Sequence, residues 1–173
     1  MLFRSYVMMA FRIAWFKVYQ PLAYYAAYFT IRAEGSFNAP VILKGLESQK
    51  AELARIAALE HSTAVEKGNA TVIEVAAEMY LRGMEFLPID LDRSDASEFK
   101  MVDGKLLPPF NCIPALGDAV AKEIVRARDE HLFTSKEDLK KRGKVSQSII
   151  DTMDSMGILK NMPDEEQISL FSF

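Results

Sequence analysis

The residues of this chain best suited to chemistry form a short pattern that occurs twice. Gly117 follows Ile113 by four residues, and Gly143 follows Leu139 by four, 26 residues further along. After each glycine, apolar residues recur at helical spacing. Glycine allows a tight turn in a conformation that other residues adopt poorly. The turn then leaves unpaired amides at the start of a helix, which together with the helix dipole bind anions.

An apolar residue, three further residues, a glycine and a helix form the layout of a helix-hairpin-helix motif. A phosphodiester fits its amides, and such recognition does not depend on base sequence. Two tandem hairpins would hold a phosphate on each strand across the minor groove. Ordinary helical hairpins also use glycine, so the prediction depends on the repeat and the basic cluster at the second turn. The predicted DNA contacts are Ile113, Pro114, Ala115, Leu116, Gly117, Asp118, Ala119, Lys122, Lys140, Lys141, Arg142, Gly143, Lys144, Val145 and Ser146.

One position departs from this motif, whose turn commonly has glycine where this chain has Ala115. Alanine adopts a positive φ less easily than glycine. We therefore expect either that the first hairpin holds its phosphate less well, or that the register of the repeat differs slightly.

The last residues form a second candidate site, with the sequence Gln167-Ile168-Ser169-Leu170-Phe171. Chain ends are normally polar, so a Leu-Phe pair here suggests two apolar anchors for a partner's pocket, with Gln167 adding directional hydrogen bonds. From spacing alone, it is equally possible that Leu170 and Phe171 fold back onto their own domain. The pentapeptide resembles the one with which bacterial replication proteins bind the ring-shaped sliding clamp.

Other reactive side chains do not form a catalytic constellation. Asp90, Asp92 and Asp95 are spaced like metal ligands, but they flank a short extended segment and lead into a turn, where aspartates ordinarily cap the backbone. We expect no metal there. Cys112 is the only cysteine, which excludes an internal disulfide. We expect it to be a small buried apolar residue.

The elements that must position these sites are mostly helical. Apolar spacing predicts helices over 2–19, from Pro21 to Arg32, over 41–60, and from Thr71 to Tyr80. We expect Lys67-Gly68-Asn69 to interrupt the helical pattern before the last of these helices. Thr71 with Glu74 resembles a capping box at the start of that helix. Gly83 should end it.

The second half of the chain carries the remaining local signals. Asp103-Gly104 predicts a two-residue turn joining strands at 99–102 and 105–107. Ser135 with Asp138, or Thr134 with Glu137, should cap a short helix, and Gly157 should end the last one.

Charge is distributed unevenly along the 173 residues, which are enough for one domain or two small ones. Residues 1–33 carry four cations and no acid, whereas the whole chain has a net charge of −3. Overall charge therefore does not attract this chain to nucleic acid, and any DNA contact must come from local patches or backbone amides.

The N-terminal segment is apolar on nearly all sides. Its longest uncharged run, Val18–Ile31, is too short for a membrane-spanning helix, which needs about 20 apolar residues. We expect the segment to pack against further protein. The alternative is a stand-alone interaction or membrane-surface protein that uses residues 1–33 as an amphipathic anchor. A nuclease or repair accessory is a weaker third option, because no carboxylate cluster supports it.

Together the elements resemble the C-terminal segment of the PolC-type replicative DNA polymerase III alpha subunit of low-GC Gram-positive bacteria. The resemblance covers the whole chain in order and is weakest over 48–68. The matching runs are Met9–Lys17, Pro21–Ala33, Asp90–Ala96, Leu107–Asn111, Ser135–Leu139, Arg142–Ser146 and Gln167–Phe171.

That resemblance implies a mainly α fold in three parts. Residues 1–85 would be the helical end of the fingers, and 86–160 a duplex-binding domain with a small β-hairpin and tandem helix-hairpin-helix motifs. Residues 161–173 would be a flexible clamp-binding tail, and Met1 an internal or truncated start. The implied partners are primer–template DNA, the sliding clamp and the rest of the polymerase chain, in the bacterial cytoplasm and without a membrane.

The resemblance also bears on catalysis. Nucleotidyl transfer in such polymerases uses two metal ions, Mg²⁺ by resemblance, held by carboxylates of the palm. Those carboxylates are missing from this chain, so we expect no cofactor here, no catalytic residue, and no polymerase activity from the chain alone.

Overall fold

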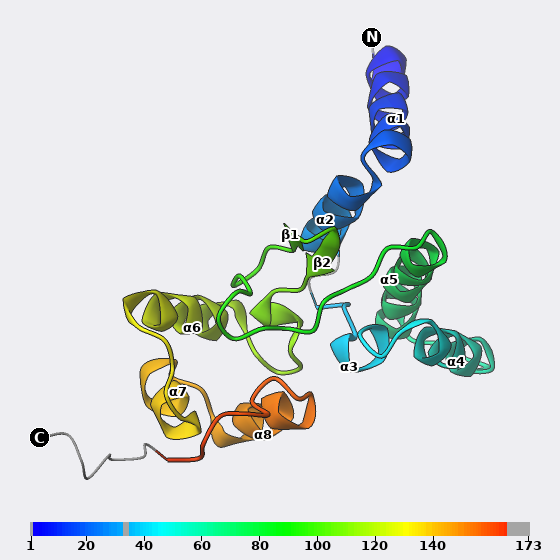
Figure 1. Ribbon diagram of the computed structural model, residues 1–173. Coiled ribbons are helices and arrows are strands. Elements are labelled where there is room, and N and C mark those ends of the chain that lie inside the picture. The colour runs from blue at the N-terminus through cyan, green and yellow to red at the C-terminus, as the bar shows by residue number, and fades with distance from the viewer. Residues whose placement is uncertain (1, 33–34, 166–173) are drawn as a thin grey trace, which may run out of the picture. The chain divides into compact units, whose positions relative to one another are not determined.

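The computed structural model describes residues 2–32 and 35–165, and these are mainly helical with one small antiparallel sheet (Figure 1). This confirms the predicted fold class. The chain divides into two compact units. Unit 1 comprises residues 1–87 and 98–107, and unit 2 comprises residues 88–97 and 108–173.

Unit 1 begins with two helices that match the sequence-based bounds. Helix α1 spans Leu2–Tyr19 and α2 spans Pro21–Arg32, with the proline in the first turn. Three more helices follow: α3 (Ala39–Ile42), α4 (Leu46–Ala57) and α5 (Ala64–Leu81).

Two predictions for this region are wrong. A single helix over 41–60 does not form, because Gly45 has a φ of +97° and separates α3 from α4. The capping box belongs to Thr63 and Glu66, with both reciprocal hydrogen bonds present. Helix α5 therefore runs through Gly68, and packing against α4 outweighs the cost of about 1 kcal/mol for a helical glycine.

The sheet and the aromatic core of unit 1 form as local chemistry suggests. Strands β1 (Lys100–Val102) and β2 (Lys105–Leu107) pair through a turn in which Asp103 and Gly104 both have positive φ, which confirms the predicted hairpin. Helix α5 ends at Leu81, and the predicted stop residue, Gly83, follows its C-cap Arg82 with a φ of +79°. The buried rings that fill the core are Phe29, Phe37, Phe86 and Phe99.

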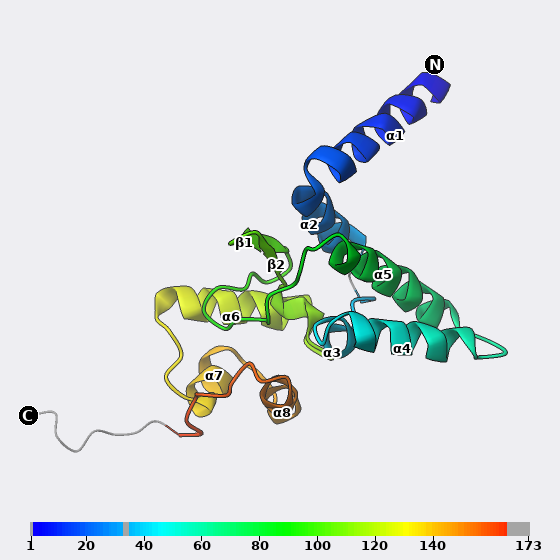
Figure 2. The same ribbon diagram turned by 45° about the vertical axis from the view of Figure 1, so that its right-hand side comes forward.

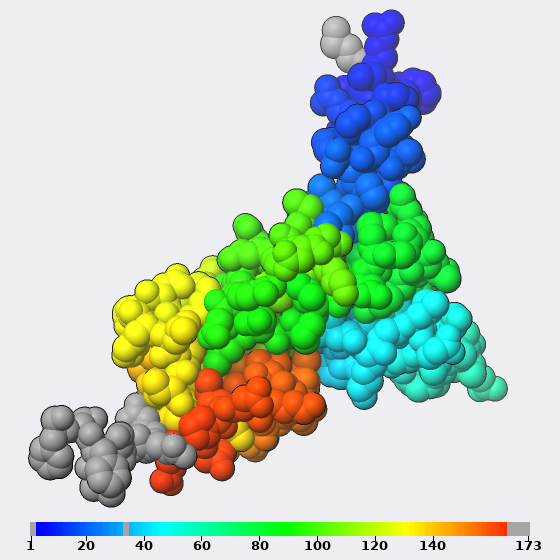
Figure 3. Space-filling model, in the orientation of Figure 1, coloured from blue at the N-terminus to red at the C-terminus, as the bar shows by residue number. Residues whose placement is uncertain are grey.

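Helix α1 lies largely outside this core. Its aromatic side chains are exposed, and those of Phe3, Tyr6 and Phe11 expose more than half of their surface. Figure 3 shows the α1 side chains (blue) at the surface of unit 1. Lys17 at the end of α1 forms a 2.8 Å ion pair with Glu78 of α5. No helix within the described residues is both long and apolar enough to cross a membrane.

Within its described residues, 88–97 and 108–165, unit 2 contains three α-helices and a short 3-10 helix (Figure 2). These are η1 (Phe110–Cys112), α6 (Asp118–Glu130), α7 (Lys136–Arg142) and α8 (Gln147–Ser155). Ser135 caps α7 by accepting the Asp138 amide at 3.0 Å, and Gly157 follows α8 with a φ of +78°, as predicted. Phe110, Ile124, Leu139 and Met153 are fully buried in its core.

The 90–97 segment of unit 2 confirms the capping interpretation of two of its aspartates. Asp90 Oδ1 accepts the amides of Asp92 and Arg93 at 2.9 and 3.1 Å, and Asp95 Oδ1 accepts that of Ser97 at 3.2 Å. Cys112 is buried, as predicted, and burial raises the pKa of its thiol.

Candidate nucleic-acid interface

The first turn lies between η1 and α6. Ala115 has a φ of +64°, so it occupies the left-handed region predicted to be difficult for alanine. Leu116 next to it is buried, and Gly117 is the N-cap residue of α6 with extended backbone. The bend therefore consists of one left-handed residue, one buried apolar residue and an N-cap.

The second turn lies between α7 and α8 and repeats that backbone. Lys144 has a φ of +53°, Val145 is buried, and Ser146 is the N-cap residue of α8 with extended backbone. The two N-cap residues are closely similar, with φ −79° and ψ 160° at Gly117 and φ −72° and ψ 157° at Ser146. Gly117 has no side chain with which to cap α6, and the Ser146 side chain makes no capping hydrogen bond to α8.

The register of the repeat therefore differs from the predicted one. In backbone conformation Lys144 is the equivalent of Ala115, and Ser146 is the equivalent of Gly117. The shift of 26 is wrong because it matches the two glycines, whereas the backbone matches Gly117 to a serine. Ala115 itself occupies the left-handed position, so the first turn keeps the register of the motif, and the error lies in how the second turn was aligned to it.

Neither glycine supplies the left-handed conformation that we predicted for it. Gly117 and Gly143 both have a φ of −79°. A Cβ on Gly117 would meet nothing within 4 Å, whereas one on Gly143 would lie 2.7 Å from the carbonyl oxygen of Leu139. Gly143 is thus required by close packing, and packing gives no such reason for Gly117.

Both helix starts present free amides. The first bonds of α6 run from Val120 and Ala121 to the Gly117 carbonyl, and those of α8 from Ile149 and Ile150 to that of Ser146. Within the described residues, six amides ahead of these have no acceptor, namely those of Gly117, Asp118, Ala119, Ser146, Gln147 and Ser148. Gln147 and Ser148 were missed because the 26-residue shift placed the helix start too early. Ser146 before an apolar run was the available signal.

Four lysines flank these amides, and all four are exposed. Lys144 forms a 2.9 Å ion pair with Glu123 of α6, Lys141 pairs with Glu137 at 2.8 Å, and Lys140 donates to Gln147 Oε1 at 3.0 Å. Hydrogen bonds from Arg126 and Lys144 lower the pKa of Glu123 to about 2. Lys122 has no hydrogen bond or ion pair in the part of the chain that the structure describes.

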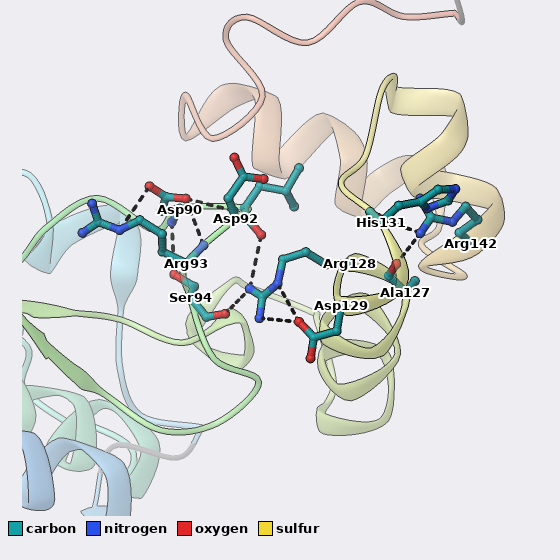
Figure 4. Close-up of polar contacts among 10 residues, drawn as sticks. Asp90, Asp92, Arg93, Ser94, Ala127, Arg128, Asp129, His131 and Arg142 are labelled. Carbon is teal, nitrogen blue, oxygen red and sulfur yellow. Dashed lines mark hydrogen bonds and ion pairs between the residues drawn. The ribbon is translucent and has the colours of Figure 1, made fainter.

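Arg142 is placed differently from these lysines. Its guanidinium donates to the carbonyls of Ala127 and His131 at the end of α6 and to Asp138 Oδ2, as Figure 4 shows in part. It also lies over the ring of Phe133, 4.9 Å from the centroid. The guanidinium is occupied by protein groups, which leaves the expected phosphate contact through this side chain without support.

The remaining predicted residues fall into two groups. The side chains of Ile113, Leu116 and Val145 are buried, so only their backbone could touch DNA, whereas Pro114, Asp118 and Ala119 are exposed. The clamp-binding residues Gln167, Ile168, Ser169, Leu170 and Phe171 lie outside the described residues. Among the described residues, no group of three or more His, Cys, Asp or Glu side chains is placed to hold a metal ion.

Comparisons with known proteins support the motif. Residues 83–168 match the family described as "Helix-hairpin-helix motif". Proteins named "DNA polymerase III PolC-type" match 96% of this chain at 48% identity in Thermotoga maritima, 50% in Listeria monocytogenes and 48% in Bacillus subtilis. The alternative use of residues 1–33 as a membrane anchor finds no support in these matches.

The match covers nearly all of this chain but only a small part of each relative. The chain spans only 12% of the length of these curated relatives. Nearly all of this chain therefore aligns with one segment of proteins that share the name "DNA polymerase III PolC-type", and the chain carries a helix-hairpin-helix motif over residues 83–168.

Proposed function

We propose that this chain binds double-stranded DNA through backbone phosphates, as part of a replicative DNA polymerase on its primer–template. The observation that carries the proposal is the repeated bend, which twice leads into a helix whose first amides are open. The helix-hairpin-helix match and the name shared by the relatives point the same way.

The contacts would be of two kinds. The amides of residues 117–119 donate to one phosphate and those of residues 146–148 to a second, because helix starts combine unpaired donors with the positive end of the dipole. Lys122, Lys140, Lys141 and Lys144 add charge around them. Since all of these groups reach the backbone only, binding does not select a base sequence.

Lys144 must leave Glu123 to reach a phosphate. The ion pair is available for exchange because the Lys144 side chain is 72% exposed, although that of Glu123 is 18% exposed, and water screens a pair that is open on one side. DNA binding therefore replaces one carboxylate partner by another anion.

Titration of a labelled duplex with the full chain at several salt concentrations tests the proposal. The double variant Lys122→Met, Lys144→Met should bind about tenfold more weakly near 0.1 M salt, with the slope of log K against log salt reduced by about two. The matched control Lys50→Met, Lys67→Met removes the same charge from exposed positions of unit 1 and should bind as the parent does. Unchanged affinity in the first variant, or strong preference between duplexes of unrelated sequence, would overturn the proposal.

We further propose that Gln167–Phe171 binds the sliding clamp, with Leu170 and Phe171 as the buried anchors. Support comes from the pentapeptide sequence alone. Such a tether raises the effective concentration at the primer end without tight intrinsic binding. Deleting 167–173 should abolish binding to purified clamp and leave duplex affinity unchanged; equal clamp affinity after the deletion would end this part of the proposal.

The proposed role is binding, with no catalytic step assigned to a residue of this chain. Chemistry in a polymerase of this family would depend on Mg²⁺ held by carboxylates elsewhere in the full protein. The proposal also places the chain in the bacterial cytoplasm, together with the rest of that polymerase.

A further inference from the structure

Two arginines of unit 2 direct their guanidinium groups at main-chain carbonyls (Figure 4). Arg128 of α6 is 9% exposed and donates to the carbonyls of Leu91 and Ser94, the latter at 2.5 Å. Arg142, the last residue of α7, donates to the carbonyls of Ala127 and His131. Arg142 is the one that connects the two hairpins.

The Arg142 contacts have a clear electrostatic cause. The last carbonyls of a helix lack intrahelical partners and carry the negative end of the dipole. At this helix end, the Ala127 carbonyl accepts a long 3.4 Å bond from the His131 amide. One planar guanidinium satisfies both carbonyls, while Asp138 at 2.9 Å and the Phe133 ring hold its plane in place.

The position of Arg142 gives these contacts a consequence for the two turns. Helix α6 begins at the first turn, and the residue after Arg142, Gly143, begins the second. The Arg142 side chain therefore joins the far end of the first hairpin to the corner of the second. A second link, the ion pair of Lys144 with Glu123, uses a highly exposed lysine and so fixes orientation weakly.

We propose that Arg142 is a positioning residue for duplex binding: it holds the second turn at a set spacing from the first, so that both turns meet phosphates of one duplex. This rests on the proposed function. When two turns are held rigidly, binding of the first to a duplex raises the effective concentration of the second phosphate at the second turn. This advantage is lost when the two turns move independently.

Replacing Arg142 by lysine distinguishes two roles that its positive charge could have, a direct phosphate contact and a bridge between two carbonyls. A direct phosphate contact tolerates lysine, because the charge remains. A bridge between two carbonyls does not, because an ammonium group lacks the planar fork and the stacking face. Arg142→Lys therefore separates positioning from charge.

The first experiment measures duplex affinity for Arg142→Lys, Arg142→Met and the control Lys141→Met, with folding checked by circular dichroism. We expect both Arg142 variants to bind at least about tenfold more weakly, with a shallower salt dependence as one turn disengages. Lys141→Met, the exposed neighbour, should lose less than either. Parent-like affinity in Arg142→Lys would overturn the proposal.

The second experiment needs no DNA, so it separates failure of this inference from failure of the proposed function. Spin labels on Lys122→Cys of α6 and Asp151→Cys of α8, both exposed, report the distance between the hairpins. The native Cys112 is buried and its thiol has a raised pKa, so it should not compete for label. Arg142→Lys should broaden the distance distribution, and an unchanged distribution would overturn the inference whatever the DNA result.

A milder variant covers the case in which Arg142→Lys does not fold. Asp138→Asn weakens the carboxylate that orients the guanidinium and that also accepts the Thr134 amide at 3.3 Å, and it leaves the two carbonyl contacts of Arg142 in place. We expect a smaller broadening and a smaller loss of duplex affinity. Parent-like values for both quantities in this variant would contradict the positioning role.

Discussion

The first and second turns of unit 2 share one backbone bend but build it from different residues. The left-handed position is Ala115 in one and Lys144 in the other, and the N-cap is Gly117 in one and Ser146 in the other. What the turns have in common is a conformation and a set of open amides. The glycines that draw attention to the motif do not occupy equivalent places.

The two turns also differ in charge. Three predicted lysines, Lys140, Lys141 and Lys144, lie in or beside the second turn, whereas the first has the carboxylate of Asp118, held by Asn111 at 3.0 Å. Phosphate contacts at the second turn should therefore depend more on salt than those at the first. The comparison suggests that the first turn contributes geometry and the second most of the electrostatic attraction.

The largest difference between the two turns is expected when one methyl group is added to Gly143 or to Gly117. Gly143→Ala would place a Cβ 2.7 Å from the Leu139 carbonyl oxygen and 3.2 Å from Val145 Cγ2, both in buried surroundings. We expect the free energy of unfolding to fall by about 2 kcal/mol, within the range for overpacked sites. Chemical denaturation followed by circular dichroism measures it.

Gly117→Ala is the matched control for that variant. Its Cβ meets nothing within 4 Å and its backbone is extended, so loss of the favoured N-cap glycine and the gain from a stiffer unfolded chain should nearly cancel, within about 0.5 kcal/mol. Equal destabilisation by both variants would show that the two glycines have the same role after all.

The second prediction concerns the ion pair that crosses between the turns. Glu123→Gln removes the partner of Lys144 and should tighten duplex binding by about threefold, because a weak surface pair no longer competes with phosphate for the ammonium group. Fluorescence anisotropy with a labelled duplex measures this. A gain in affinity is informative, since damage to the fold would only weaken binding.

Two controls belong with this variant. Glu130→Gln removes an equal charge from α6 at a residue that pairs with Arg126 instead, and it should change affinity less. In the background of Lys144→Met, Glu123→Gln should lose most of its effect. If both glutamates behave alike, the pair with Lys144 has no special role.

The pKa of Glu123 determines the pH range in which the duplex affinities of the parent and Glu123→Gln can be compared. Because the folded-state pKa is about 2, below the ordinary value of 4.5, the pair is fully formed above pH 4.5 and is lost only as the pH falls through 2. Affinities of the parent and Glu123→Gln can therefore be compared at neutral pH without a change in the protonation of this carboxylate.

The smallest effect is expected at the left-handed residues. Ala115→Gly relieves a positive φ that costs about 1 kcal/mol for alanine, but it adds freedom to the unfolded chain, for a net gain of about 0.5 kcal/mol. Thermal unfolding should show a rise in melting temperature of a few degrees at most. A clear loss of stability would indicate that the alanine methyl group packs favourably and outweighs the strain.

Local chemistry explains why much of the fold followed from the sequence. The hairpin at Asp103-Gly104, the Ser135 cap and the stop at Gly157 each depend on residues within four positions of one another. Prediction failed where two local signals competed. Thr63 with Glu66 and Thr71 with Glu74 have the same spacing, and only the packing of α5 along α4 decides which pair begins the helix.

The candidate site likewise has features that follow from local sequence and features that depend on tertiary packing. The amino-acid sequence by itself determined that two turns with helices behind them follow each other, since turn residues and apolar spacing act over a few positions. Only the tertiary structure decided that Gly143 has no room for a methyl group, and that the Arg142 guanidinium lies at carbonyls 11 and 15 residues away. Those outcomes depend on which helix ends packing brings together, and no short sequence pattern encodes them.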